Sequence, residues 1–306
     1  AGLFSRRAYN IDSLAVGPTE NPDISRMTIV INVESHSLEQ VIRQLDKLIN
    51  VIHIAELKLD DSVQAELLLV KISATSKNRF DVDAVPHVLC GGFTKEETEN
   101  LLIDLDFIGV ENVLALRGDA PKAERFVAEP NGHSFASELV EQVIHMNQGK
   151  YLHEETEPSF QTDFCVGVAG YPEKHFEAPS LKFDLKYLKE KVDKGASYVV
   201  TQMFFDNERY FKFVEAARAI GINVPIIPGI KPIAVKRHLQ ILPQVFKIDI
   251  PEALIHEVEK CKDNHQVRQV GVEWAIKQSQ ELLKAGVPVL HYYSMGKSDN
   301  IKAIAS

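Results

Sequence analysis

The stretch Asn112-Val113-Leu114-Ala115-Leu116-Arg117-Gly118-Asp119-Ala120-Pro121 joins an apolar run directly to a cation, a glycine and an anion. The apolar run predicts a buried strand, so Arg117-Gly118-Asp119 stands at its carboxyl end. In parallel α/β folds, ligands bind beyond the carboxyl ends of the strands. A single Arg-Gly-Asp is more simply a turn after a strand, but the same layout recurs further along the chain.

From about residue 80 onward, strand-like runs alternate with helical patterns. The expected strands are 84–90, 112–116, 164–169, 198–202, 224–228 and 289–293, and the expected helices are 94–105, 137–146, 184–194, 208–220, 235–242, 252–261 and 267–285. This alternation predicts parallel strands joined by right-handed crossovers, an α/β fold of the (β/α)8 TIM-barrel type. Such a barrel usually takes about 250 residues. With at least six units, either the barrel begins before residue 80 or the sheet is open.

Residues 1–80 have a different pattern. Strands are expected at 10–16, 27–33, 51–57 and 66–72, with an amphipathic helix at 38–48. With one more strand in front, this order would be a βαββαβ sandwich, so it predicts a partial ferredoxin-like α+β segment. We therefore expect two domains, 1–80 and 81–306.

Polar groups end five of the six strands in the second part. They are Pro86-His87, Arg117-Gly118-Asp119, Tyr171-Pro172-Glu173 with His175, Gln202 with Asp206, and Tyr292-Tyr293. Taken alone, His87 is a hydrogen-bonded core histidine and Gln202 a strand-end cap. Together on one rim, these groups favour a concave polar site.

The composition narrows the function. A net charge of −9 argues against nucleic-acid binding, which needs clustered cations. The three cysteines form no Cys-x-x-Cys pair, so we expect no metal site or disulfide framework, and three unpaired thiols fit a reducing cytoplasm. No apolar run approaches the ~20 residues that span a bilayer, and no signal peptide is evident at the start, so no membrane association is expected.

Two resemblances to known families can be stated on these residues. Residues 2–14, 25–29 and 44–48 resemble the ACT domain of the acetolactate synthase small subunit, a likeness that extends over about 1–72. That resemblance implies valine binding at a dimer interface. Asn10 matches a valine-contacting asparagine, but the loop and first strand of that site are not found here, and Asn10 is more simply a turn residue.

Residues 83–304 resemble methylenetetrahydrofolate reductase. The matching motifs are Pro86-His87 with Cys90, Ala115-Leu116-Arg117-Gly118-Asp119, Ala169-Gly170-Tyr171-Pro172-Glu173 with His175, Asp184-Leu185-Lys186 with Lys189-Glu190-Lys191-Val192, Thr201-Gln202-Met203-Phe204-Phe205-Asp206, Ile227-Pro228-Gly229-Ile230 and His291-Tyr292-Tyr293. The resemblance implies a (β/α)8 barrel that holds FAD, takes hydride from NADH or NADPH and reduces 5,10-methylenetetrahydrofolate. A homo-oligomer is also expected.

The same resemblance implies the site residues. Asp119, beside the flavin, and Gln202, on the folate pterin, are the expected catalytic residues, and Gln202 and Tyr293 the expected substrate contacts. The expected cofactor contacts are His87, Leu116, Arg117, Gly118, Asp119, Phe135, Ala136, Ala169, Tyr171, His175, Asp184 and Lys191. Phe135 stands where the family has tyrosine, so a hydroxyl is lost there.

One departure affects the expected activity. The family's first two strands, one carrying a general-acid glutamate and the next a flavin loop, have no counterpart in residues 1–80. We therefore expect impaired turnover. The alternatives are a valine-sensing regulatory module of acetolactate synthase and a non-functional chimera with unpaired strand edges.

Overall fold

The computed structural model describes residues 11–18, 25–31, 41–43, 45–47, 50–54, 84–119, 126–153, 160–294 and 299–305. The chain divides into two compact units, Ala1–Ser73 and Ala74–Ser306. No helix within the described ranges is both long and apolar enough to cross a membrane.

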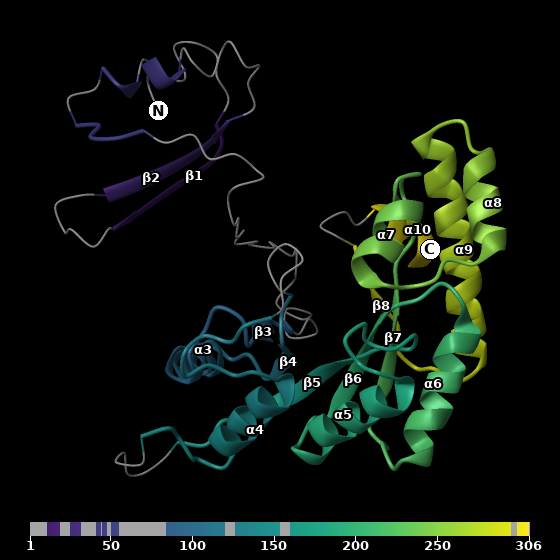
Figure 1. Cartoon of the computed structure of the whole chain (residues 1–306), viewed down its shortest axis with the longest axis horizontal. Helices are drawn as coiled ribbons and strands as arrows, with labels where there is room; N and C mark the ends of the chain where they lie inside the picture. Colours follow the sequence, from purple (N-terminus) through teal and green to yellow (C-terminus); the bar gives the residue numbers. More distant parts are fainter. Residues whose placement is uncertain are drawn as a thin grey trace, which may run out of the picture. The chain divides into compact units, whose positions relative to one another are not determined.

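The described part of the first unit contains an antiparallel strand pair. Strands β1 (Ile11–Pro18) and β2 (Ser25–Ile31) pair from Ile11 opposite Ile31 to Pro18 opposite Ser25 (Figure 1). Residues 41–43 and 45 are helical, as expected, and Val41 is buried. Residues 51–54 are not a strand, which corrects the expectation for 51–57, and β1 continues through the expected turn residues at 17–18. Asn10 and the expected strand at 66–72 lie outside the described residues.

The second unit is built on six parallel strands in simple sequence order, β3-β4-β5-β6-β7-β8. The strands are β3 (His87–Leu89), β4 (Asn112–Leu116), β5 (Cys165–Gly170), β6 (Tyr198–Met203), β7 (Ile226–Ile230) and β8 (His291–Tyr292). Because neighbours in the sheet are also neighbours in the chain, this is the order of a (β/α)8 barrel wall, and the fold class expected from the sequence is confirmed.

Helices connect these strands. They are α3 (Lys95–Phe107), α4 (Ala136–Asn147), α5 (Leu181–Asp193), α6 (Asn207–Ala219), α7 (His238–Phe246), α8 (Glu252–Lys260), α9 (Asn264–Lys284) and α10 (Asp299–Ala305). The expected capping box is present, because Glu97 N–H donates to Thr94 and Thr94 N–H donates to Glu97. Helix α7 continues past Pro243, where the sequence pattern had ended it, and α10 was not expected.

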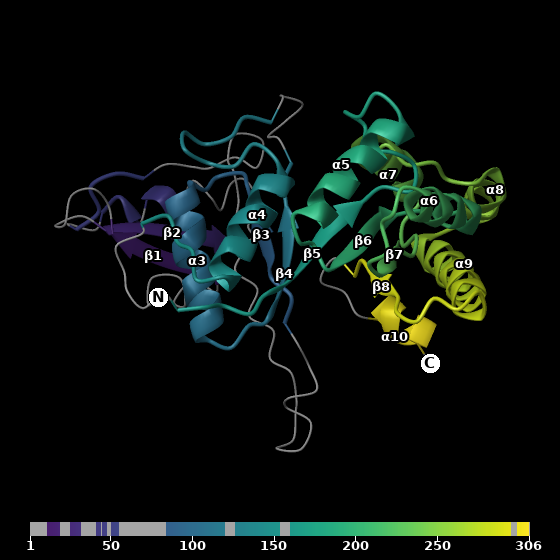
Figure 2. The same cartoon turned by 90° about the horizontal axis from the view of Figure 1, so that it is seen from below.

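The two faces of the sheet differ. Val113, Ala115, Val166, Val168 and Val199 pack with the helices in one buried core. Figure 2 shows α5, α6 and α9 along that same side of strands β5 to β7. Side chains alternate along a strand, so the residues between these valines and alanines form the opposite, inner face. His87 of β3, Ala169 of β5 and Gln202 of β6 fall in that inner series.

Two rim assignments need correction. His87 is the first residue of β3 and pairs with Leu114, not with the strand-end Leu116, so it lies within the sheet and not at its carboxyl edge. The Tyr292 hydroxyl forms a hydrogen bond with Ser279 Oγ of α9 at 2.8 Å, so this side chain belongs to the helix-covered face. The alternation of side chains along a strand decides which face of the sheet a residue takes. The first strand of this unit was expected to begin at residue 84, but β3 begins at His87.

Candidate functional site

Arg117 leaves the end of β4 and is held from two sides. Its guanidinium forms an ion pair with Glu177 at 2.6 Å and lies 5.0 Å from the centre of the Phe126 ring. The Arg117 carbonyl accepts a hydrogen bond from Gly91 N–H at 3.1 Å, which ties this loop to the one after β3. Gly118 follows with a φ of +88°, a conformation that glycine adopts without strain. The turn therefore presents a positioned cation beside an open stretch of backbone.

The loop after β5 brings an aromatic residue, a histidine and a carboxylate together. The Tyr171 and His175 rings meet edge to face with centroids 4.7 Å apart. His175 backbone N–H donates to Asp184 Oδ2 at 2.9 Å, which joins the loop to the first turn of α5. This loop is fixed by α5 rather than free, so its side chains keep a defined orientation.

Lys191 reaches the same region from the far end of α5. Its ammonium donates to the carbonyl oxygen of Ala169 at 2.5 Å. Burial lowers the pKa of Lys191 to about 8, and Asp184 opposes that shift. The ammonium therefore stays mostly charged at neutral pH but loses its proton at a lower pH than an exposed lysine, which titrates near 10.4.

Electrostatic interactions join these groups into one network. Burial raises the pKa of Tyr171, and the charges of Asp184 and Asp119 raise it further. Burial lowers the pKa of His175, with Arg117 acting in the same direction. Burial raises the pKa of Asp184, against the hydrogen bond from His175. The carboxyl ends of β4 and β5 thus share a half-buried cluster of both charge signs.

The other side of the sheet's mouth is formed by β6 to β8. The Tyr293 hydroxyl donates to the Thr201 carbonyl at 2.8 Å, and the Tyr293 and His291 rings meet edge to face at 4.7 Å. Burial lowers the pKa of His291, and so does the charge of His87. His87 and His291 come from the first and last strands of this sheet.

The structure brings together most, but not all, of the expected site residues. The connected network contains Arg117, Asp119, Ala169, Tyr171, His175, Asp184, Lys191 and Tyr293. Leu116 joins it through its carbonyl, which accepts a hydrogen bond from Cys90 N–H. Gln202 caps its own strand, since its side-chain carbonyl accepts from Met203 N–H at 3.0 Å. Phe135 and Ala136 begin α4, where Phe135 is exposed.

Sequence reasoning missed two participants, Phe126 and Glu177, and it named His291 only within a matching motif and not as a site residue. Their partners Arg117 and Tyr293 were singled out, but no local pattern pairs an arginine with a glutamate sixty residues later. Among the described residues, no group of three or more histidine, cysteine or acidic side chains could hold a metal ion.

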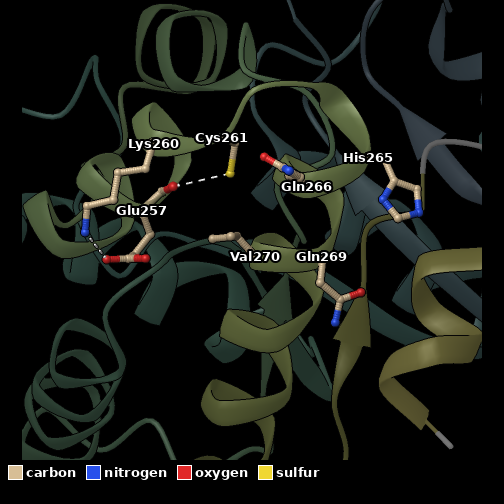
Figure 3. Close-up of a pocket in the computed structure, with 7 residues that line it drawn as sticks. All are labelled: Glu257, Lys260, Cys261, His265, Gln266, Gln269 and Val270. Carbon is tan, nitrogen blue, oxygen red and sulfur yellow. Dashed lines mark hydrogen bonds and ion pairs between the residues drawn. The ribbon is translucent and has the colours of Figure 1, made fainter.

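A separate shallow pocket lies between α8 and α9. Figure 3 shows Cys261, Gln266 and Val270 around it, with the Cys261 thiol donating to the Glu257 carbonyl at 3.3 Å. Glu257 and Lys260 form an ion pair at its edge. None of the expected site residues lines this pocket.

Comparisons with known proteins identify the family. The methylenetetrahydrofolate reductase model matches residues 62–306. This chain belongs to the methylenetetrahydrofolate reductase family. The matched region begins earlier than the resemblance at 83–304, and it contains the whole network described above.

Relatives of the family agree with this assignment. A probable methylenetetrahydrofolate reductase (NADPH) of Caenorhabditis elegans is 34% identical over 76% of this chain and 33% of its own length. Methylenetetrahydrofolate reductase (NADH) 1 of Arabidopsis thaliana is 35% identical over 74% of this chain and 38% of its own length. The 5,10-methylenetetrahydrofolate reductase of Pectobacterium carotovorum is 30% identical over 76% of this chain and 72% of its own length. The chain therefore spans about a third of the length of the first two relatives.

A second family model matches the start of the chain. The AHAS small subunit-like ACT domain model covers residues 1–53, a shorter range than the resemblance over 1–72. One solved structure, a Clostridium thermocellum protein described as binding 5-methyl-5,6,7,8-tetrahydrofolic acid, covers 75% of this chain at 17% identity and a TM-score of 0.45. A likeness that weak carries no argument here.

Proposed function

We propose that this chain binds FAD and uses NADH or NADPH to reduce 5,10-methylenetetrahydrofolate to 5-methyltetrahydrofolate. The observation that carries the proposal is the cluster of Arg117, Asp119, Tyr171, His175, Asp184 and Lys191 inside the region matched by the reductase family model. When bound, FAD accepts a hydride from one substrate and gives it to the other.

The cluster fits a dinucleotide that carries an aromatic ring system and a diphosphate. Arg117 and Lys191 supply two cations, and a guanidinium matches phosphate geometry with two parallel donors. Gly118 has no side chain, which lets the backbone approach a ligand closely, and it adopts its φ of +88° without strain. Asp184 and His175 add a hydrogen-bonded pair that can receive hydroxyl groups. His87, Leu116, Phe135, Ala136 and Ala169 are the other proposed cofactor contacts.

Asp119 and Gln202 are the proposed catalytic residues. Asp119 is exposed at the end of β4 and contributes a negative charge that already acts on Tyr171. Such a charge next to a redox-active ring shifts its reduction potential. Gln202 lies at the end of β6 and can both donate and accept hydrogen bonds, which suits a pterin edge. Tyr293 offers an aromatic surface beside it, while its hydroxyl remains bonded to Thr201.

The test is flavin binding followed by turnover. Purified protein should show flavin absorbance, or acquire it when titrated with FAD, and Arg117→Met should weaken that binding. NADH and NADPH should be compared as donors to the bound flavin under anaerobic conditions. Protein that folds cooperatively but takes up no FAD at millimolar concentration would rule the proposal out. A broad, non-cooperative thermal transition would instead favour the non-functional chimera.

A second function rests on the ACT-domain match at residues 1–53. This segment would act as a valine-sensing module for a synthase, and isothermal calorimetry with valine tests it directly. No heat with valine, together with normal FAD binding, would leave only the reductase function.

We further propose a cytoplasmic homo-oligomer with domains at 1–80 and 81–306. Three free thiols support the reducing compartment. Light scattering would give the oligomeric state, and limited proteolysis would locate the domain boundary.

A further inference from the structure

Lys231 directly follows β7, at the same end of the sheet as the cluster. Strand alternation places residues 227 and 229 on the inner face, and Lys231 continues that series. Its neighbour across the sheet is Tyr293, whose N–H donates to the Ile230 carbonyl at 2.9 Å. The Tyr293 ring packs over Gly229, where an added β carbon would lie 2.7 Å from it. Lys231 therefore stands beside the proposed substrate tyrosine.

Lys231 is unusually buried for a lysine that has no partner. Only 7% of its surface is exposed, and within the described residues it makes no hydrogen bond or ion pair. Among the described residues, the buried side-chain atoms that lack a hydrogen-bond partner are His133 Nδ1 and Glu173 Oε1. Lys231 Nζ is not among them, so its stem is buried while its ammonium still reaches solvent.

This arrangement leaves an unsatisfied cation in the mouth of the sheet. Burial lowers the pKa of Lys231, and its charge lowers the pKa of His238 nearby. A poorly solvated ammonium gains more from an anionic partner than a solvated one does.

Lys231 is separate from the cations of the proposed flavin site. Arg117 ends β4, and β7 is three strands further along the sheet. With strands spaced about 4.8 Å apart, the two positions are separated by roughly 14 Å. A group bound by Lys231 therefore belongs to a ligand on the β6–β8 side of the site, the side of Gln202 and Tyr293.

We propose that Lys231 binds an anionic group of the substrate that occupies the β6–β8 side of the site. This inference rests on the proposed function. Two sources share the chemistry: a carboxylate of the folate glutamate, or a phosphate of the nicotinamide dinucleotide. Either would form a charge-assisted hydrogen bond with the ammonium and fix the substrate's orientation against Gln202.

The first experiment measures the accessibility of Lys231 and needs no turnover. Wild-type protein is labelled with trinitrobenzenesulfonate at pH 8, and peptide mass spectrometry follows Lys231 in the presence of 5-methyltetrahydrofolate, NADH or inorganic phosphate. We expect one of the two organic ligands to slow labelling of Lys231 about tenfold, and that ligand identifies the source. Protection by phosphate alone, or by none of the three, would overturn the proposal.

The second experiment compares variants. Lys231→Met keeps the buried stem without the charge, Lys231→Arg keeps the charge, and Lys277→Met removes an exposed lysine of α9 as the control. We expect Lys231→Met to weaken the protecting ligand about 10- to 100-fold, while Lys231→Arg and Lys277→Met stay within about threefold of wild type. Unchanged binding in Lys231→Met would refute the proposal, and matching circular dichroism would exclude misfolding.

The outcomes separate this inference from the proposed function. Normal FAD binding and turnover with an unprotected Lys231 would remove only the Lys231 subsite. Protection of Lys231 in a protein that takes up no FAD would remove the reductase function and leave an anion site.

Discussion

Lys191 Nζ lies 2.5 Å from the carbonyl oxygen of Ala169, so a cation from the last turn of α5 is held at the upper end of β5. Asp184, in the first turn of the same helix, interacts with Lys191 electrostatically. This contact connects the helix layer to the proposed cofactor site. The protonation state of Lys191 should therefore affect both folding and cofactor binding.

Flavin retention should fall as pH rises through the pKa of Lys191, about 8. The proposed diphosphate loses a cation between pH 7 and 9, so we expect FAD to bind several-fold more weakly at pH 9. Lys191→Arg, whose guanidinium stays charged, should show no such fall. Fluorescence titration of the apoprotein with FAD at each pH is the measurement, and equal affinity at pH 7 and 9 in wild type would contradict the expectation.

Loss of the Lys191 proton should weaken flavin binding but stabilise the folded chain. Its pKa is about 8 in the folded chain and 10.5 ordinarily, so between these values the unfolded chain binds more protons. Stability contributed by Lys191 must then rise from pH 8 to 10.5. Between pH 8 and 10.5, we expect the thermal midpoint of the apo wild-type protein to rise relative to that of Lys191→Arg. Differential scanning fluorimetry of both proteins would measure this difference.

Phe135→Tyr should tighten FAD binding. Phe135 precedes α4 with 60% of its surface exposed, so an added hydroxyl meets no steric barrier. If this position contacts the cofactor, one new hydrogen bond of about 0.5–1.5 kcal/mol corresponds to roughly 2- to 10-fold higher affinity. Phe160→Tyr, at 67% exposure, is the matched control and should leave the affinity unchanged. An equal effect of both substitutions would show that position 135 is not a flavin contact.

Gly271→Ala should destabilise the second unit. A β carbon there would lie 1.9 Å from the Ile233 carbonyl oxygen, because α9 packs directly against the backbone after β7. Backbone cannot move aside as a flexible side chain can, so we expect a loss of at least about 1–3 kcal/mol. Gln280→Ala, exposed on the same helix, should stay within about 0.5 kcal/mol. Urea unfolding of both variants would measure this difference.

Turnover of 5,10-methylenetetrahydrofolate should be slow even when FAD is bound. Within these 306 residues we find no glutamate in the strand context of the family's general acid. A missing general acid costs on the order of 10²–10⁴ in rate. The Pectobacterium relative, assayed side by side, provides the reference. A kcat within tenfold of that enzyme would show that another group protonates the substrate, and Asp119→Asn would then test the exposed carboxylate that follows β4.

Much of the second unit could be predicted because its signals are local. Each of the six expected strands is present, and Thr94 with Glu97 forms the expected capping box. Gly195 ends α5 with a φ of +117°, as a glycine after a helix should. These features depend on residues within one element, where apolar spacing and turn chemistry decide the outcome.

The errors have a different origin. The sequence analysis placed both His87 and Tyr292 on the rim, because each lies in or next to the apolar run of an expected strand. Pairing with Leu114 moved His87 into the sheet, and packing against Ser279 turned Tyr292 toward α9. Both outcomes depend on the register with a neighbouring element, which no stretch of one strand contains.

By itself, the sequence determined the parallel α/β class and the family, because alternating apolar patterns and motifs are written along a single line of residues. Only the tertiary structure decided that Glu177 pairs with Arg117, that the Tyr293 hydroxyl bonds to the Thr201 carbonyl and that Lys231 is buried without a partner among the described residues. The physical reason is that burial and charge pairing arise between segments far apart in the chain, and they exist only once the sheet has formed and the helices have packed against it.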